Sequence, residues 1–248
     1  CNETVMTSSR TPDPETRIPA LSPIREFGLK AALWLPLAFV IWFWAAPLWV
    51  WPAMRLAKAV LLGHWGDLFE SVRLGGELLD EGGHVVARAG YLVSLATRVT
   101  VDVQGGVGVL EPTLNPMVYA WSLPLFGGLA MATPLSTARR LLQFALALAV
   151  IWLGQAFGIV AESLKTLAFD AGASGAAAVA RAGLNANAIA IAYQFATLVL
   201  PAVVPAALWI GLNRDFIERL VGQGREPRRL DRGQKGHEGE GDGPVSPG

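Results

Sequence analysis

Charged residues are absent from four long stretches of the chain, and apolar residues fill most of their positions. The four stretches are Ala31–Met54, Pro112–Ala138, Leu141–Ala161 and Ala182–Asn213, with 24, 27, 21 and 32 residues. A helix needs about 20 apolar residues to cross a hydrocarbon core of ~30 Å. A charge at mid-bilayer costs about 2.5–3.5 kcal/mol on insertion scales. The pattern therefore predicts four transmembrane helices.

The connection between the first two predicted spans, from about Arg55 to Glu111, shows two patterns in turn. The segment Ala53–Glu70 mixes apolar and charged positions as an amphipathic helix does, and we expect this helix on the outer leaflet or over the bundle. Further along, β-branched residues dominate, and glycine pairs at 82–83 and 105–106 are typical of hairpin turns. Short strands are expected at His84–Arg88, Leu92–Val103 and Val107–Glu111.

The other connections are shorter. A turn around Thr133–Arg140 makes the second and third spans antiparallel neighbours. After the third span, Leu164–Ala171 fits a short interfacial helix, and Ala171–Gly183 is either a weakly structured return or a re-entrant helix. In the last span, Pro201 and Pro205 predict a kink, because proline removes a helical hydrogen bond.

The composition supports a membrane protein. Hydrophobic residues make up 52% of the chain and charged residues only 16%, against about 25% charged residues in soluble domains. The predicted fold class is a mainly α, polytopic membrane protein with four transmembrane helices and a small extracytoplasmic α+β insert. We expect a disordered N-terminal tail at 1–26, a membrane domain at 27–217 with its insert at about 53–111, and a disordered C-terminal tail at 218–248.

Basic residues predict the orientation. Thirteen of the 20 lie before the first span, between the second and third, or after the fourth. The positive-inside rule then places both termini in the cytoplasm and the insert outside, although Arg55 and Lys58 argue weakly the other way. The net charge is zero, so we expect no nucleic-acid partner. The basic half of the C-terminal tail suits contact with anionic membrane lipids.

The chain offers little material for catalysis. Its only cysteine is Cys1, which excludes an intrachain disulfide, and we interpret residues 1–5 as lying upstream of a natural start at Met6. The three histidines, at positions 64, 84 and 237, lack the spacing of a metal site. Ser163 and Lys165 are two residues apart and do not face each other on a helix. We expect no enzyme activity, no metal and no cofactor.

A few polar residues interrupt the spans or flank them. Gln155 and Glu162 are seven residues apart on one helix face, with Lys165 three further on, and Tyr193–Gln194 in the last span could face them. Interhelical hydrogen bonding with a Glu–Lys pair, a polar docking stripe for a partner, and a proton or ion relay are all compatible with this pattern. Asn115–Pro116 fits a cap and first turn of the incoming helix.

The segment from Asn115 to Phe126 reads NPMVYAWSLPLF, and it resembles the NP-x-x-Y-x-x-x-LPLF segment of the exosortase H-associated membrane protein family. Four further segments in the same order resemble that family, so the resemblance covers about residues 27–217. They are Leu33–Pro36 with Trp42–Trp44, Leu164–Phe169, Ala192–Gln194, and Leu200–Pro205 with Leu208–Trp209.

The resemblance implies a bacterial inner-membrane protein encoded beside an exosortase, in a sorting system of the PEP-CTERM type. Exosortases are transpeptidase-like membrane enzymes that use a Cys, an Arg and a His, and this chain has no internal Cys. It therefore looks like a non-catalytic accessory protein whose partners are the exosortase or its sorting-signal substrate. The alternative is a small transporter or permease subunit. The candidate partner-binding or family-motif residues are Asn115, Pro116, Tyr119, Gln155, Glu162, Lys165, Tyr193 and Gln194.

Overall fold

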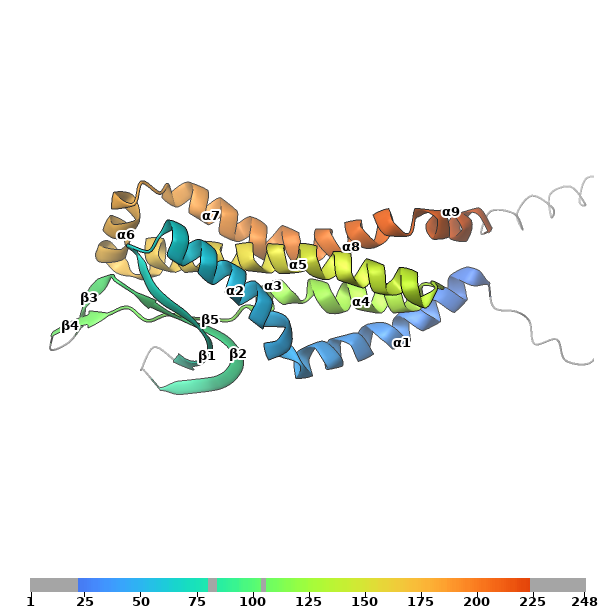
Figure 1. Ribbon diagram of the computed structural model, residues 1–248, viewed down its shortest axis with the longest axis horizontal. Coiled ribbons are helices and arrows are strands. Elements are labelled where there is room, and N and C mark those ends of the chain that lie inside the picture. Colours follow the sequence, from blue (N-terminus) through green and yellow to red (C-terminus); the bar gives the residue numbers. More distant parts are fainter. Residues whose placement is uncertain (1–21, 80–83, 104–105, 224–248) are drawn as a thin grey trace, which may run out of the picture.

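Most helices run along the long axis of the molecule, and the strands gather at one end of it (Figure 1). The computed structural model describes residues 22–79, 84–103 and 106–223. Helix α1 (Pro23–Trp44) begins and helix α9 (Arg214–Gln223) ends at the opposite end from the strands. We call these two ends the sheet end and the terminal end. The helical residues 23–26 and 218–223 had been assigned from sequence to the disordered tails.

The first charge-free stretch does not form one helix. Helix α1 ends at Trp44, and α2 (Ala46–His64) begins after Ala45. Pro47 lies in the first turn of α2, where its fixed φ and missing N–H are tolerated, and without an N–H it cannot donate the hydrogen bond that would continue α1. The predicted span Ala31–Met54 is therefore divided by a bend at Ala45.

Helix α2 packs on the bundle along one face. That face is buried at Ala46, Val50, Ala53, Met54, Ala57 and Leu61, and it contacts α5 (Thr137–Lys165) and the first two strands. The amphipathic helix predicted for Ala53–Glu70 thus begins seven residues earlier and ends at His64, and it covers the bundle.

The strands form two small antiparallel sheets. One has the order β1 (Phe69–Leu79), β2 (Val85–Thr97), β5 (Thr113–Leu114), and the other pairs β3 (Thr100–Val103) with β4 (Gly106–Val109). The buried residues Phe69, Val72, Val93 and Leu95 join the core that α2 and α5 complete.

The strand predictions are partly correct. The hairpin near Gly105–Gly106 is present, since Val103 pairs with Gly106. The predicted strand Leu92–Val103 is broken after Thr97, where β2 ends. Strand β1 was not predicted, because its glycines and charges hide the pattern and bulges around Gly75 shift its register against β2. The turn predicted at 82–83 lies outside the described residues.

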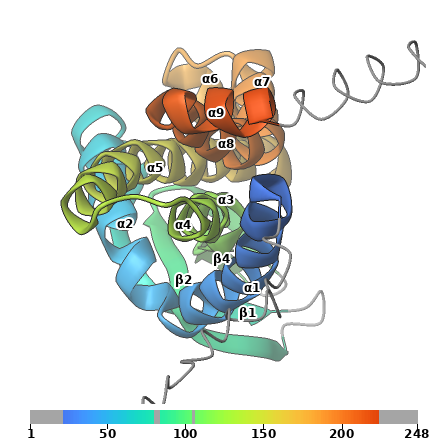
Figure 2. The ribbon, with the colours of Figure 1, turned by 90° about the vertical axis from the view of Figure 1, so that its right-hand side faces the viewer.

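The second predicted span forms two short helices, α3 (Met117–Ala120) and α4 (Ser122–Ala132), separated by a turn at Trp121. Together they cover 16 residues, or about 24 Å at 1.5 Å per residue, which is shorter than a ~30 Å hydrocarbon core. Figure 2 shows α4 in the middle of the bundle, and it contacts α1, α5 and the later helix α8. A helix in this position is buried against protein on most sides.

Three continuous helical segments of the described chain are long and apolar enough to cross a membrane. They are Pro23–Trp44, Thr137–Asp170 and Ala186–Leu212. The predicted count of four spans is therefore not confirmed. Large apolar side chains on these segments, such as Leu33, Leu142 and Leu198, are about two-thirds exposed or more, as lipid-facing residues are.

Two π-helical segments form part of the longest helical stretches. Segment η1 (Thr166–Asp170) continues α5, so the short interfacial helix predicted at Leu164–Ala171 is the end of a longer helix. It is followed by α6 (Gly172–Arg181), so the Ala-rich stretch is helical.

The last span is a second interrupted helix. Segment η2 (Phe195–Val199) separates α7 (Ala186–Gln194) from α8 (Leu200–Leu212). It ends two residues before Pro201, which cannot donate a helical hydrogen bond. The kink predicted from the proline pair stays a prediction, and the structure places a π-helical segment just before the pair.

Candidate functional site

Charged and phenolic side chains meet at the sheet end of α5. The Tyr119 hydroxyl donates to Glu162 Oε2 at 3.0 Å, and Lys165 Nζ bonds Asp170 Oδ2 at 2.7 Å. The Lys165 ammonium also lies 5.5 Å from the centroid of the Tyr193 ring, within the range of a cation–π contact. We call these five residues the sheet-end cluster.

Tyr119 reaches Glu162 because α3 lies against a glycine of α5. A Cβ on Gly158 would come within 2.5–2.9 Å of the Tyr119 ring, which is too close for any other residue without a shift. Asn115 Oδ1 accepts the N–H of Met117, the first residue of α3, at 3.2 Å. Pro116 occupies the N-cap position of α3, where the sequence had predicted Asn115 as the cap and Pro116 in the first turn. The sequence around Asn115 thus fixes the helix that carries Tyr119.

The π-helical segments shape both sides of the cluster. Asp170 is the last residue of η1, and Tyr193 lies two residues before η2, whose Thr197 hydroxyl donates to the Tyr193 carbonyl. Single π turns inside α-helices occur frequently at functional sites. The Lys165–Asp170 ion pair is partly exposed, so it contributes only about 0–1 kcal/mol to stability and remains open to other partners.

The other predicted site residues have different environments. Gln155 is 2% exposed, and its Nε2 lies 3.5 Å from the Pro116 carbonyl, so it contacts the start of α3. Gln194 is exposed and lies outside the cluster. The predicted Glu162–Lys165 ion pair does not form, because Lys165 turns to Asp170 and Glu162 to Tyr119.

A second polar cluster, at the terminal end, was missed by the sequence analysis. The amides of Gln143 and Asn213 bond each other in both directions, at 3.1 and 3.3 Å, and both side chains are less than 5% exposed. Gln143 Nε2 also donates to Leu212 O, and Asn213 Nδ2 to Trp209 O. We call this pair the amide clamp, since it joins α5 to α8.

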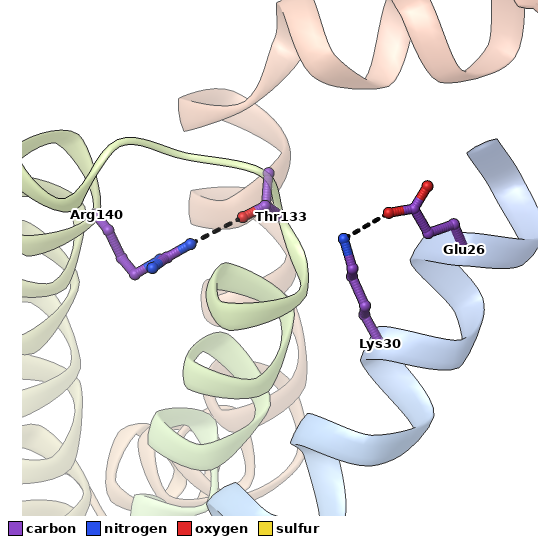
Figure 3. A network of polar contacts seen from close by, with 4 residues as sticks. All are labelled: Glu26, Lys30, Thr133 and Arg140. Carbon is purple, nitrogen blue, oxygen red and sulfur yellow. Dashed lines mark hydrogen bonds and ion pairs between the residues drawn. The ribbon is translucent and has the colours of Figure 1, made fainter.

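The amide clamp extends to α4 through the turn after it. Trp209 Nε1 donates to Thr133 Oγ1 at 3.0 Å, and Arg140 donates to the Thr133 carbonyl at 3.3 Å. Figure 3 shows the Arg140–Thr133 contact, with the Glu26–Lys30 ion pair of α1 nearby. The sequence did contain a sign of this cluster, because Gln143 and Asn213 each lie at the end of a predicted span, near Arg139–Arg140 and Arg214. Charge-free runs do not reveal such residues.

No group of three or more His, Cys, Asp or Glu side chains within the described ranges is placed to hold a metal ion. The sheet-end cluster contains two carboxylates, one ammonium and two phenols. This set offers hydrogen bonds and charge to a partner, and it contains no side chain of the usual nucleophiles Ser, Thr and Cys.

The fold and its exposed apolar helices define a mainly helical membrane protein with a small sheet. The family described as exosortase H-associated membrane protein matches residues 21–216. The chain belongs to this family, and the resemblance found in its motifs is confirmed. The family name associates its members with exosortase H. No curated protein and no solved structure matches the chain.

Proposed function

We propose that this chain is a non-catalytic accessory protein of the bacterial inner membrane that assists an exosortase, or the protein that the exosortase sorts. Membership of the exosortase H-associated family, over residues 21–216, is the observation that carries this proposal. The long apolar helices with exposed Leu and Phe side chains suit work within the bilayer, where the enzyme lies.

In this proposal the chain crosses the membrane four times, with both termini in the cytoplasm. Helices α1 and α5 both run from the terminal end toward the sheet end, and α4 runs back between them (Figure 1). The direction of α4 supports a return crossing by α3–α4, even though the pair is short. Extended residues on both sides of α3–α4, within the charge-free run Pro112–Ala138, supply the missing length.

Reporter fusions at Gly83 and Gly233 test this topology. The account expects periplasmic activity at Gly83 and cytoplasmic activity at Gly233, since 13 of the 20 basic residues lie on the predicted inner side. The same side for both reporters would contradict the four-span arrangement and the periplasmic sheet.

The partner contacts the sheet end in this proposal, at the sheet-end cluster and the apolar surface beside it. Phe157 of α5 and Phe195 of η2 form an edge-to-face pair with centroids 6.4 Å apart, and both rings are more than 40% exposed. Ile191 is 67% exposed one turn before Phe195. A membrane helix of a partner can pack on these apolar residues and bond Glu162 or Lys165 at its polar end.

Co-purification with the exosortase, after expression of both in a strain that lacks the chromosomal copy of this gene, tests the function. We expect the wild-type protein to retain the enzyme and a deletion strain to accumulate unsorted substrate. Normal sorting in the deletion strain would remove the accessory role. A defect in the transport of a solute in the deletion strain would instead favour the permease interpretation.

A further inference from the structure

A polar pocket of about 280 Å³ lies at the sheet end, between the strands and α6. Its polar lining comes from Asp67, Arg98, Thr100, Ser174 and Arg181, and buried Leu68 and Ala178 form apolar parts of its wall. It involves none of the residues of the sheet-end cluster. The pocket is therefore a separate feature, built by residues about 30 to 110 positions apart in the chain.

The fold holds Arg98 in place at the end of β2. Its backbone N–H donates to the Leu68 carbonyl at 2.9 Å, and its Nε donates to the Gly66 carbonyl at 3.0 Å. Both bonds tie it to the turn between α2 and β1. The two terminal nitrogens of the guanidinium group bond no other residue in the described part of the chain, so they are available to a ligand.

Arg181 approaches the same pocket from α6. It is the last residue of that helix and is exposed, and its side chain forms no hydrogen bond or ion pair within the ranges that the structure describes. Gly175 allows α6 to pack directly against η1, because a Cβ there would overlap the Leu167 carbonyl. The position of Arg181 opposite the strands thus depends on a tight helix contact.

Asp67 adds an acceptor to the lining of the same pocket. No ion pair joins it to Arg98 or Arg181, although all three side chains line one small pocket. Together, the two guanidinium groups and the Asp67 carboxylate carry a net charge of +1. The carboxylate is not paired with either guanidinium group. A ligand that carries both an anion and a cation satisfies all of them.

We propose that this pocket binds a phosphate ester that also carries a primary ammonium group, with the phosphate on Arg98 and Arg181 and the ammonium donating N–H bonds to Asp67; the quaternary ammonium of phosphatidylcholine has no N–H to donate. Guanidinium groups bind phosphate oxygens in bidentate geometry, and the Thr100 and Ser174 hydroxyls supply two further donors. A carboxylate, with two oxygens, uses fewer of these donors than a phosphate does. Phosphoethanolamine represents this class, as a soluble compound or as a lipid headgroup.

Isothermal titration of the full chain, in nanodiscs of phosphatidylcholine, tests the proposal with three soluble probes. We expect phosphoethanolamine to bind, inorganic phosphate to bind about tenfold more weakly, and ethanolamine not to bind, because inorganic phosphate lacks the contact with Asp67 and ethanolamine lacks the contacts with both arginines. Equal binding of phosphoethanolamine and inorganic phosphate, or no binding of either, would overturn the proposal.

Two variants and a control make the test specific. Arg181→Ala should weaken phosphoethanolamine binding about tenfold or more, and Asp67→Asn should remove the preference over inorganic phosphate. Arg139→Ala, which removes an exposed arginine at the terminal end, should leave binding unchanged. Unchanged binding in Arg181→Ala, with the same melting temperature as wild type, would refute the pocket.

Nanodiscs that contain phosphatidylethanolamine separate the two sources of the ligand. If the lipid headgroup fills the pocket, titration with soluble phosphoethanolamine gives no signal in these nanodiscs and a full signal in phosphatidylcholine. If the ligand is soluble, both nanodiscs give the same signal. Either result supports the pocket and assigns its source.

Discussion

Helix α5 carries a polar cluster at each end, and the two clusters differ in chemistry. At the terminal end, Gln143 and Asn213 are uncharged, less than 5% exposed, and bonded to each other in both directions. At the sheet end, Glu162 and Lys165 are charged and partly exposed, and they bond Tyr119 and Asp170 rather than each other. A satisfied, buried and neutral pair stabilises helix packing, whereas a charged and accessible cluster can exchange its partners.

The helices around the two clusters also differ in how regular and how exposed they are. The helices around the amide clamp are regular α-helix, with Trp209 and Thr133 extending the network to α4. The sheet-end cluster adjoins two π-helical segments and the exposed Phe157–Phe195 pair. We infer that the terminal end holds the bundle together and that the sheet end meets the partner.

The largest effect is expected from filling the space beside Tyr119. Gly158→Ala places a Cβ about 2.5 Å from the Tyr119 ring, and such overpacking costs about 1–3 kcal/mol. Gly154→Ala is the matched control one turn earlier, because its Cβ would make an ordinary 3.8 Å contact with Leu200. Thermal unfolding in detergent measures both. Equal melting temperatures for the two variants would show that α3 does not lie against α5 as described.

A smaller loss is expected from breaking the amide clamp. Gln143→Leu leaves the Asn213 amide without its partner, and interhelical hydrogen bonds in membranes are worth about 0.6–2 kcal/mol. We expect a lower unfolding temperature and unchanged co-purification with the exosortase. The double variant with Asn213→Leu should be less destabilised than the sum of the single changes, as a double-mutant cycle detects. If the two single losses in unfolding free energy simply add in the double variant, the two amides do not stabilise each other.

The smallest effect on stability is expected at Glu162. Glu162→Gln keeps an oxygen that accepts from the Tyr119 hydroxyl, so the change in unfolding free energy should stay within about 0.5 kcal/mol. The charge is lost, and co-purification with the exosortase should therefore decrease. A stable variant with full co-purification would show that the carboxylate charge has no role in binding.

The sequence predicted the bundle better than its details. Charge-free runs located the apolar helices, because a bilayer excludes charge over ~30 Å regardless of tertiary contacts. They did not reveal the bend at Ala45, which depends on Pro47. They also did not reveal that α3–α4 is short, which is possible because this pair lies in the centre of the bundle. The β3–β4 hairpin was predictable from its glycines. Strand β1 was not, because its bulges depend on pairing with β2 and break the alternating pattern in the sequence.

The candidate site was predictable in part for a similar reason. The seven-residue spacing of Gln155 and Glu162 and the Asn115 turn before α3 are local features that a sequence displays. The Tyr119–Glu162 bond joins residues 43 positions apart, and the Lys165–Asp170 pair depends on a π turn. Long-range partners of this kind are set by helix packing, so Gln155 and Gln194 were grouped with residues that they do not contact.

Site-specific crosslinking compares the two ends of the molecule most directly. A photoreactive amino acid is placed at Ile191, which is 67% exposed at the sheet end, or at Leu142, which is 70% exposed at the terminal end. Both variants are illuminated in cells that also express the exosortase. The account predicts a crosslink to the exosortase from position 191 and none from position 142. A crosslink from position 142 alone would contradict the assignment of the partner to the sheet end.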